Sequence, residues 1–481
     1  MTRALIVVFD ALRPEFVTHA LMPNLHAFAA EGARFANSRS TFPTETRVNQ
    51  SAVITGCYPR RHGIVANRFP LPDAMPGAVL NSGDDTALEA AVSRLTGRLI
   101  EVPTLGEILA AAGKTYATIS AGTPGGGRLI NLMAEQTGGF RLALKRPEAA
   151  VPAGAFDDIR ARLGPLPEYS VPALDWNGYA TEIYLDHVES EIAPDVMLLW
   201  LCEPDESFHW HGIGSAKALE AITQMDRLFG RVLARQSSAI EAGDLQIVAM
   251  SDHGQISLAG GKLRLAERLA KAGFAASDHP GTDCTVVVHN GGGIWVRDGD
   301  AELTRRLIHW LRDQPWCGPV FTKDGAEGTL AQAELCADHP RSADIVLALD
   351  HHDGLNDWGR AGLSADNAPY PDHGGCHGGL SRFELENFIA MGGSAFRRGA
   401  VVEAPAANVD ILPTVLSLLG VAFDHQIDGR VLGEALAGGT GDVAPEAQTI
   451  TSENTAGRRS HLSFTEHQGT RYLNRAWADP A

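Results

Sequence analysis

The sequence lacks long apolar runs and paired cysteines. No stretch reaches the roughly 18 apolar residues of a membrane-spanning helix. The apolar run 4–9 starts almost at Met1 and ends at Asp10, so we expect no secretory signal. The six cysteines are scattered without paired spacing, which is typical of reduced thiols. These absences predict a cytoplasmic protein with no membrane as its partner.

The sequence also has few basic residues relative to acidic ones. The 58 acidic residues outnumber the 40 basic ones, giving a net charge of -18. This excess argues against nucleic acid polymers and anionic membranes as main partners. It does not exclude a small phosphorylated or anionic substrate, because a bound cation inverts the local field. We find no internal repeat, and a homo-oligomer stays open.

Short apolar runs that alternate with helical patterns are what the sequence does contain. This alternation predicts an α/β fold with a mostly parallel central sheet and helices on both faces. The strands are predicted at 4–9, 115–120, 196–201, 246–250, 345–349 and 388–391. Helices are predicted at 23–31, 104–112, 215–234 and 410–419, each with a suitable start or stop residue.

The motifs divide the chain into three parts. We predict a catalytic core from 1–258 and 370–440, because the conspicuous acidic and histidine residues fall there. Residues 259–369 separate two motif-bearing regions and have strand and helix signals of their own, so we interpret them as an inserted cap subdomain. Residues 441–481 are rich in small and polar types and are predicted to be a peripheral C-terminal extension.

Three acidic residues stand just beyond three predicted strands: Asp10, Asp205 and Asp252. In an open α/β sheet the carboxyl ends of the strands form the ligand crevice, so these carboxylates should converge. Converging carboxylates repel one another unless cations lie between them. Histidines accompany them at His209, His253 and His377. Carboxylate with imidazole is a ligand set that suits zinc or a similar transition metal.

These residues lie in motifs that resemble a known family. Asp10 stands in Val-Phe-Asp-Ala-Leu-Arg-Pro, Thr46 ends Thr-Phe-Pro-Thr-Glu-Thr, and Asn67 ends Thr-Gly-Cys-Tyr-Pro-Arg-Arg-His-Gly-Ile-Val-Ala-Asn. Glu-Pro-Asp-Glu-Ser-Phe-His, Ser-Asp-His-Gly and His-Gly-Gly follow later in the chain. From about Arg3 to Val421, the sequence resembles the type I phosphodiesterase/nucleotide pyrophosphatase family of the alkaline phosphatase superfamily. The resemblance implies an alkaline-phosphatase-like fold.

The resemblance also implies a two-metal hydrolase that cleaves phosphodiester or pyrophosphate bonds. Its cofactors would be two divalent metal ions, zinc in the first place and manganese as the alternative. Thr46 would be the nucleophile and form a phosphothreonine that water then cleaves, while Asn67 would donate to a phosphoryl oxygen. One ion would bind to Asp205, His209 and His377, and the other to Asp10, Thr46, Asp252 and His253.

Several residues compete with these assignments. Thr41 and Thr44 share a segment with Thr46, and His211 and His373 lie near His209 and His377. Asn67 would also suit an ordinary turn. The stretch Gly122–Arg128 is glycine-rich but lacks the Lys-Ser/Thr of a phosphate-binding loop, so we interpret it as an ordinary loop.

One residue departs from the family pattern. The nucleophile of these enzymes is usually followed by a phenylalanine that stacks on a nucleoside base, whereas Thr46 is followed by Arg47. Because a guanidinium prefers a carboxylate or phosphate, we expect Arg47 to bind an anionic group of the substrate. Related phosphonoacetate hydrolases share the metal pattern, so phosphonate or phosphomonoester hydrolysis is the alternative function. A phosphomutase or a non-catalytic metal-binding protein ranks below both.

Overall fold

An eight-stranded mixed sheet carries the predicted acidic residues. The computed structural model describes residues 2–440, 442–454 and 457–480, so the outermost residues of the predicted core and extension lie outside it. The strands follow the order β21 (Ala400–Val402), β2 (Ala33–Phe35), β20 (Ile389–Gly392), β9 (Leu245–Met250), β1 (Arg3–Phe9), β8 (Val196–Leu201), β6 (Tyr116–Ser120) and β7 (Phe140–Ala143). The five strands from β9 to β7 run parallel.

Alternate side chains of the central strands enter two different cores. In β1, Leu5, Val7 and Phe9 pack on one face with helices α1 (Pro23–Glu31), α8 (Ala155–Leu163), α9 (Leu174–Ile183) and α11 (Ala216–Glu241). Ala4, Ile6 and Val8 pack on the other face with α2 (Thr46–Thr55), α5 (Leu105–Ala111) and α15 (Ile411–Leu418). Both faces are therefore covered, as a buried parallel sheet requires.

Three details differ from the sequence prediction. The predicted strand 388–391 runs antiparallel to β9, because it enters the sheet from the opposite end. The predicted strand 345–349 is β16 (Ile345–Leu349), which pairs with β13 and β14 in another sheet, since an apolar run does not specify its partner. Helix α11 continues to Glu241, seven residues past the predicted end at 234, and its last turns are held by Gln236, which is buried, and by Ala239 and Ile240, which pack against the core.

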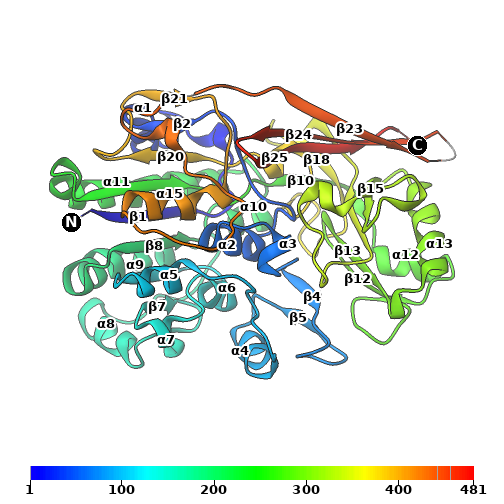
Figure 1. The fold of residues 1–481 in the computed structure, drawn as a ribbon, viewed down its shortest axis with the longest axis horizontal. Coiled ribbons are helices and arrows are strands. Elements are labelled where there is room, and N and C mark those ends of the chain that lie inside the picture. The colour runs from blue at the N-terminus through cyan, green and yellow to red at the C-terminus, as the bar shows by residue number, and fades with distance from the viewer. Residues whose placement is uncertain (1, 441, 455–456, 481) are drawn as a thin grey trace.

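The segment predicted to be an inserted cap builds a six-stranded sheet around its own hydrophobic core. The sheet order is β11 (Ala276–Ser277), β12 (Cys284–Val288), β13 (Gly291–Val296), β16, β14 (Cys317–Thr322) and β15 (Leu330–Ala331). Helices α12 (Leu265–Lys271) and α13 (Ala301–Arg312) belong to the same region at one end of the molecule (Figure 1). The proposed domain boundaries stay a prediction.

A four-stranded sheet connects this region with the core. Its order is β17 (His351–Leu355), β18 (Ala361–Asp366), β10 (Ile256–Lys262) and β19 (Gly375–Cys376). Strand β10 crosses the predicted boundary at 258/259, and β19 leads directly to His377. Strand β19 pairs with β10, which follows β9 in the chain, and this pairing fixes the loop that carries His377.

The C-terminal strands form an antiparallel meander of β23 (Ala447–Glu453), β24 (Arg459–His467) and β25 (Thr470–Ala478). Figure 1 shows it in red along one edge of the molecule. Leu462, Phe464 and Leu473 share a buried cluster with Phe42 and Phe321. The meander therefore packs on both the core and the inserted region.

The α-helices and strands not yet named are short, and of these β4 and α10 contribute residues to the pocket described below. They are β3 (Ser38–Arg39), α3 (Pro59–His62), β4 (Arg68–Pro70), β5 (Val79–Asn81), α4 (Asp85–Arg94), α6 (Pro124–Leu129), α7 (Ala134–Thr137), α10 (Asp205–His211), α14 (Arg382–Leu385) and β22 (Ala406–Ala407). None of the helices in the described part of the chain has the length and apolarity needed to cross a bilayer.

Candidate functional site

The three predicted carboxylates come together at the carboxyl ends of the parallel strands. Asp10 directly follows β1, Asp205 begins α10 after β8, and Asp252 follows β9. Two groups have ligand atoms that all lie within 4.8 Å of one another: Asp205 with His209 and His377, and Asp10 with Asp205 and His253. Residues spread over most of the chain therefore meet at one sheet edge, as predicted.

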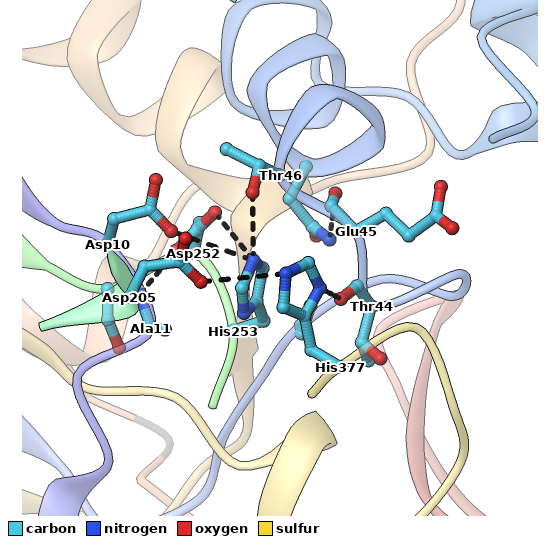
Figure 2. A network of polar contacts seen from close by, with 12 residues as sticks. Asp10, Ala11, Thr44, Glu45, Thr46, Asp205, Asp252, His253 and His377 are labelled. Atoms are coloured by element: carbon cyan, nitrogen blue, oxygen red, sulfur yellow. Dashed lines mark hydrogen bonds and ion pairs between the residues drawn. The ribbon is translucent and has the colours of Figure 1, made fainter. Parts of the chain in front are cut away.

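The nucleophile candidate faces the same place. Thr46 is the first residue of α2, and its Oγ1 lies 3.2 Å from His253 Nε2. Figure 2 shows Thr46 opposite His253, with the three aspartates on one side and His377 on the other. The backbone N–H groups at the start of a helix have no helical partners, so this end of α2 favours a bound anion.

The two competing threonines are engaged elsewhere. The Thr41 hydroxyl donates to Asn49 Oδ1 at 2.7 Å, and Thr41 is fully buried. The Thr44 hydroxyl donates to Gly379 O at 2.9 Å and accepts from the Gly378 N–H. Of the three threonines, only Thr46 lines the pocket.

The three histidines turn one ring nitrogen toward the site and the other away from it. The Nδ1 atoms of His209, His253 and His377 lie 2.8, 3.0 and 2.7 Å from the carbonyl oxygens of Gly375, Gly254 and Thr44. A carbonyl only accepts, so each Nδ1 carries the proton and donates. In the neutral ring, Nε2 then keeps a free lone pair, which is the arrangement typical of metal-ligating histidines.

The alternative histidines lie outside this cluster. His211 Nε2 is 3.1 Å from Val171 O, and His373 packs against the ring of Trp358. The structure therefore brings His209 and His377 together with the carboxylates and directs their two neighbours to other contacts.

Several carboxylate oxygens of the site lack a hydrogen-bond donor. Asp10 Oδ2 accepts from Trp200 Nε1 at 2.9 Å, and Asp252 Oδ1 accepts from the Ala11 N–H at 3.1 Å. Asp10 Oδ1 and Asp252 Oδ2 are buried without a hydrogen-bond partner in the described residues. A buried carboxylate oxygen left in this way is costly unless a cation binds it.

The pKa values of the aspartates reflect this crowding. Burial, and then the negative charge of neighbouring carboxylates, raise the pKa of Asp10 well above its usual value. Burial also raises the pKa of Asp252. For Asp205 burial acts in the same direction, but the contacts with His209, at 3.2 Å, and with His377 outweigh it and lower its pKa. The raised pKa values of Asp10 and Asp252 show that three adjacent negative charges are unfavourable here without a cation.

A pocket of about 180 Å³ opens beside these side chains. Its walls include Thr46, Asp205, His209 and His377, together with Glu45, Arg47, Asn67, Arg68, Thr123, Glu206, Val287, His289, Tyr370 and Cys376. Asn67 Oδ1 accepts from the Arg47 backbone N–H at 3.0 Å, which fixes the amide beside the start of α2. Both predicted substrate-binding residues, Arg47 and Asn67, therefore lie in the pocket wall.

Sequence reasoning missed several residues of this pocket. Tyr370 stacks on His209 with ring centroids 3.8 Å apart, and His289 comes from the inserted region. Nothing in the sequence marks either of them. Glu45 and Arg68 directly adjoin Thr46 and Asn67 in the sequence, and this adjacency could have identified them as pocket residues.

Two further glycine-rich turns, 291–293 and 374–379, meet next to His377. A side chain at Gly291 would place its Cβ 2.1 Å from Gly378 O, so only glycine permits this approach. The inserted region thus contacts the loop after β19 backbone to backbone. The interpretation of Gly122–Arg128 as an ordinary loop is wrong, because Pro124–Leu129 form helix α6 with Thr123 as its N-cap. Gly126 of this helix lies against Gln50 of α2, and Thr123 lines the pocket.

A buried amide network joins α2 to the loop that carries Asp252. Asn49 Oδ1 accepts from the Thr41 N–H and from Asn408 Nδ2, at 2.9 and 2.8 Å. Asn49 Nδ2 donates to Glu45 O, and Asn408 Nδ2 also donates to Asp252 O at 2.6 Å. These contacts fix the first turn of α2, and with it Thr46, relative to the end of β9.

Removing the centre of this network is expected to destabilise the fold. Asn49→Ala leaves several buried backbone and amide groups without partners, so it should lower the free energy of unfolding by about 3 kcal/mol. Urea denaturation followed by circular dichroism measures the loss. Asn37→Ala is the matched control, because the Asn37 amide makes only an exposed contact with Glu403 O. Equal stabilities of the two variants would contradict the role of the network.

Comparisons with known proteins identify the family. The model of the family "Type I phosphodiesterase / nucleotide pyrophosphatase" matches residues 4–352. The chain belongs to this family. Membership confirms the resemblance seen in the motifs around Asp10, Thr46, Asp205 and Asp252.

Relatives in the family match shorter stretches. A bis(5'-adenosyl)-triphosphatase, enpp4 of Xenopus laevis, is 38% identical over 67 residues, which are 14% of this chain and 15% of that protein. Venom phosphodiesterase 2 of Crotalus adamanteus is 24% identical over 238 residues, 49% of this chain and 24% of that protein. The chain thus matches less than a quarter of the length of either relative.

A solved structure confirms the fold. An inactive variant of murine ectonucleotide pyrophosphatase/phosphodiesterase 5, in complex with AMP, superposes with a TM-score of 0.60. The superposition covers 89% of this chain and 97% of that one at 17% identity. The predicted α/β, alkaline-phosphatase-like architecture is therefore correct.

Proposed function

We propose that the protein is a two-metal hydrolase that cleaves phosphodiester or pyrophosphate bonds through a phosphothreonine intermediate. One observation carries the proposal: the Thr46 hydroxyl, at the start of α2, faces His253 Nε2 and a cluster of three carboxylates and three histidines. Membership of a phosphodiesterase and pyrophosphatase family supports the reaction class. A small phosphorylated or anionic molecule is the proposed substrate.

The ligand set fits two divalent cations. Asp10 Oδ1 and Asp252 Oδ2 accept no hydrogen bond in the described residues and face His253 Nε2, and these oxygens and the Nε2 lone pairs of the histidines are the donors that such ions need. We assign one ion to Asp205, His209 and His377, and the other to Asp10, Asp252, His253 and the Thr46 hydroxyl. Mixed nitrogen and oxygen donors favour zinc, with manganese as the alternative. Bound there, the ions would promote ionisation of Thr46 and offset charge on the phosphoryl oxygens.

The reaction then runs in two displacements. The ionised Thr46 oxygen attacks phosphorus, and the alcohol or phosphate on the opposite side leaves. The Asn67 carbonyl is occupied by the Arg47 N–H, so its NH₂ group is the one left to donate to a nonbridging phosphoryl oxygen. The Arg47 N–H is already taken by Asn67 Oδ1, so the start of α2 stabilises the same charge mainly through the positive end of the helix dipole. Water afterwards attacks the phosphothreonine and frees Thr46.

Arg47 favours one alternative function. Arg47 lines the pocket and forms no ion pair in the described residues, so its guanidinium is available for an anion. An arginine beside the nucleophile suits the free oxygens of a phosphomonoester or a phosphonate. The neutral Asn67 amide leaves room for a second ester group and favours diesters.

A comparison of three substrates tests the proposal. Bis(p-nitrophenyl) phosphate should give a higher kcat/KM than p-nitrophenyl phosphate or phosphonoacetate. A chelator should abolish turnover, and added zinc should restore it. Faster turnover of the monoester or the phosphonate would favour the alternative. Full activity in the presence of the chelator, with no metal left on the protein, would contradict a metal-dependent reaction.

We also propose the cytoplasm as the compartment. All six cysteines carry buried, free thiols, which suits reducing surroundings. Cell fractionation with an antibody against the native protein tests this, and recovery outside the cytoplasmic fraction would contradict it.

A further inference from the structure

The pocket beside the carboxylate cluster contains two arginines that form no ion pair within the described part of the chain, although Asp10 and Glu45 lie close enough to Arg47 to feel its charge. Arg47 and Arg68 both line its wall. Among the residues that the structure describes, neither guanidinium forms an ion pair or a side-chain hydrogen bond, and Arg47 Nε is buried. An arginine that is partly buried normally has a carboxylate or carbonyl partner, because desolvation of the unpaired charge is costly.

Other basic side chains near the pocket are paired. Arg128 and Arg146 both bind Asp85, and Lys145 binds Glu206 at 2.9 Å. Glu206 is thereby neutralised, although it lines the pocket. The other pocket glutamate, Glu45, accepts the Asn67 backbone N–H. The acids in the wall are therefore engaged, in a chain whose acidic residues outnumber its basic ones by 58 to 40.

His289 closes the same wall from the inserted region. Burial, and then the positive charge of Arg68, lower the pKa of His289 to about 4. The imidazole is consequently neutral near pH 7 and leaves the positive charge of this wall to the two guanidinium groups. A neutral imidazole can still exchange a hydrogen bond with a bound group.

The position of the arginines in the chain indicates which part of a substrate they face. Arg47 directly follows the nucleophile candidate Thr46, and Arg68 directly follows Asn67. In an in-line displacement the leaving group departs on the side opposite to the attacking oxygen. Groups beside Thr46 and Asn67 therefore face the substituent that stays on phosphorus during the first step.

We propose that Arg47 and Arg68 bind a second anionic group, a carboxylate or a phosphate, on the substituent that stays on phosphorus. The inference rests on the proposed phosphodiesterase function and names the substrate class of the same site. Planar guanidinium groups form paired hydrogen bonds with either anion, and two of them match a dianionic ester better than a nucleoside base. His289 contributes a neutral hydrogen bond on the side of the inserted region.

Three diesters with the same leaving group test the inference. They are the 2-hydroxyethyl, carboxymethyl and 2-phosphoethyl esters of p-nitrophenyl phosphate, which share the leaving group and differ in the end group and charge of the retained substituent. We expect kcat/KM to be at least about tenfold higher for one of the two charged esters, the fold-change of one charge-assisted hydrogen bond. The carboxymethyl and phosphoethyl arms distinguish a carboxylate from a phosphate.

Variants of Arg68 test whether the arginines cause the preference for a charged ester. Arg68→Gln should reduce the ratio of charged to neutral kcat/KM by about tenfold, and Arg68→Lys should reduce it less, because a point charge remains. Arg227→Gln, on the exposed face of α11, is the matched control and should leave the ratio unchanged. Binding of the carboxymethyl and hydroxyethyl esters to Thr46→Ala, measured by calorimetry, gives the same comparison without turnover.

The outcomes separate this inference from the proposed function. Equal kcat/KM for all three esters, or a preference that survives Arg68→Gln, would overturn the anion-binding role while leaving the hydrolase intact. Hydrolysis of none of the diesters, by a protein that keeps its metal ions, would overturn the proposed function and the inference with it.

Discussion

Replacing Thr46 with alanine is expected to lower kcat for a phosphodiester by about 10⁴-fold or more. The Thr46 hydroxyl is the oxygen that combines a place in the pocket wall with a contact to His253 Nε2 at 3.2 Å. Without it, the start of α2 still binds an anion, but the first covalent step is lost. Release of p-nitrophenol under single-turnover conditions measures the effect.

Matched variants separate loss of the nucleophile from loss of structure. Thr46→Ser keeps a hydroxyl and should recover a large part of the activity, because a primary alkoxide attacks phosphorus as well. Thr44→Ala removes the hydroxyl that bridges Gly378 and Gly379, so it tests the neighbouring loop without removing the proposed nucleophile. Activity of Thr46→Ala within tenfold of the wild type would refute the assignment.

His209→Ala is expected to remove about one metal ion per chain and most of the activity. His209 belongs to one of the two candidate ligand groups, with Asp205 and His377, and its Nδ1 is already held by Gly375 O. Truncation leaves that group with two protein ligands, fewer than the three or four typical of zinc sites. Metal content by inductively coupled plasma mass spectrometry, after saturation with zinc and removal of free ion, measures the loss.

The chain offers a close control for this experiment. His211 lies two residues further along α10, but its ring contacts Val171 O and points away from the carboxylates. His211→Ala should therefore keep the metal content of the wild type. Asp205 appears in both candidate groups, so Asp205→Ala should lower the metal content at least as much as His209→Ala. A wild-type metal content in both His209→Ala and Asp205→Ala would contradict the proposed ligands.

Much of the candidate site at the edge of the large sheet can be predicted from local sequence signals. A run such as Val196–Leu201 is apolar throughout and short, which favours a buried parallel strand, and Asp205 after it must then emerge at the sheet edge. The same reasoning placed Asp10 and Asp252.

Other parts of the site depend on contacts between distant segments, which no local signal encodes. Asn49 and Asn408 are 359 positions apart, and their hydrogen bond exists only because α2 and the chain after β22 pack together. Tyr370 and His209 are likewise brought into contact by the packing of segments that are distant in the sequence. Strand β16 illustrates the limit for the fold: its apolar run predicts burial, but whether it joins β9 or β13 depends on chain topology.

The two halves of the pocket are built from different parts of the fold, and they therefore differ in how freely their residues can be substituted. One half, with Thr46 and Asp205, lies on α2 and at the carboxyl end of β8, and the buried amides of Asn49 and Asn408 fix α2 there. The opposite wall, with Val287 and His289, comes from a region that has a separate hydrophobic core. Substitutions in that region would reshape substrate choice while the reacting groups keep their spacing, so new preferences can arise in evolution without rebuilding the chemistry.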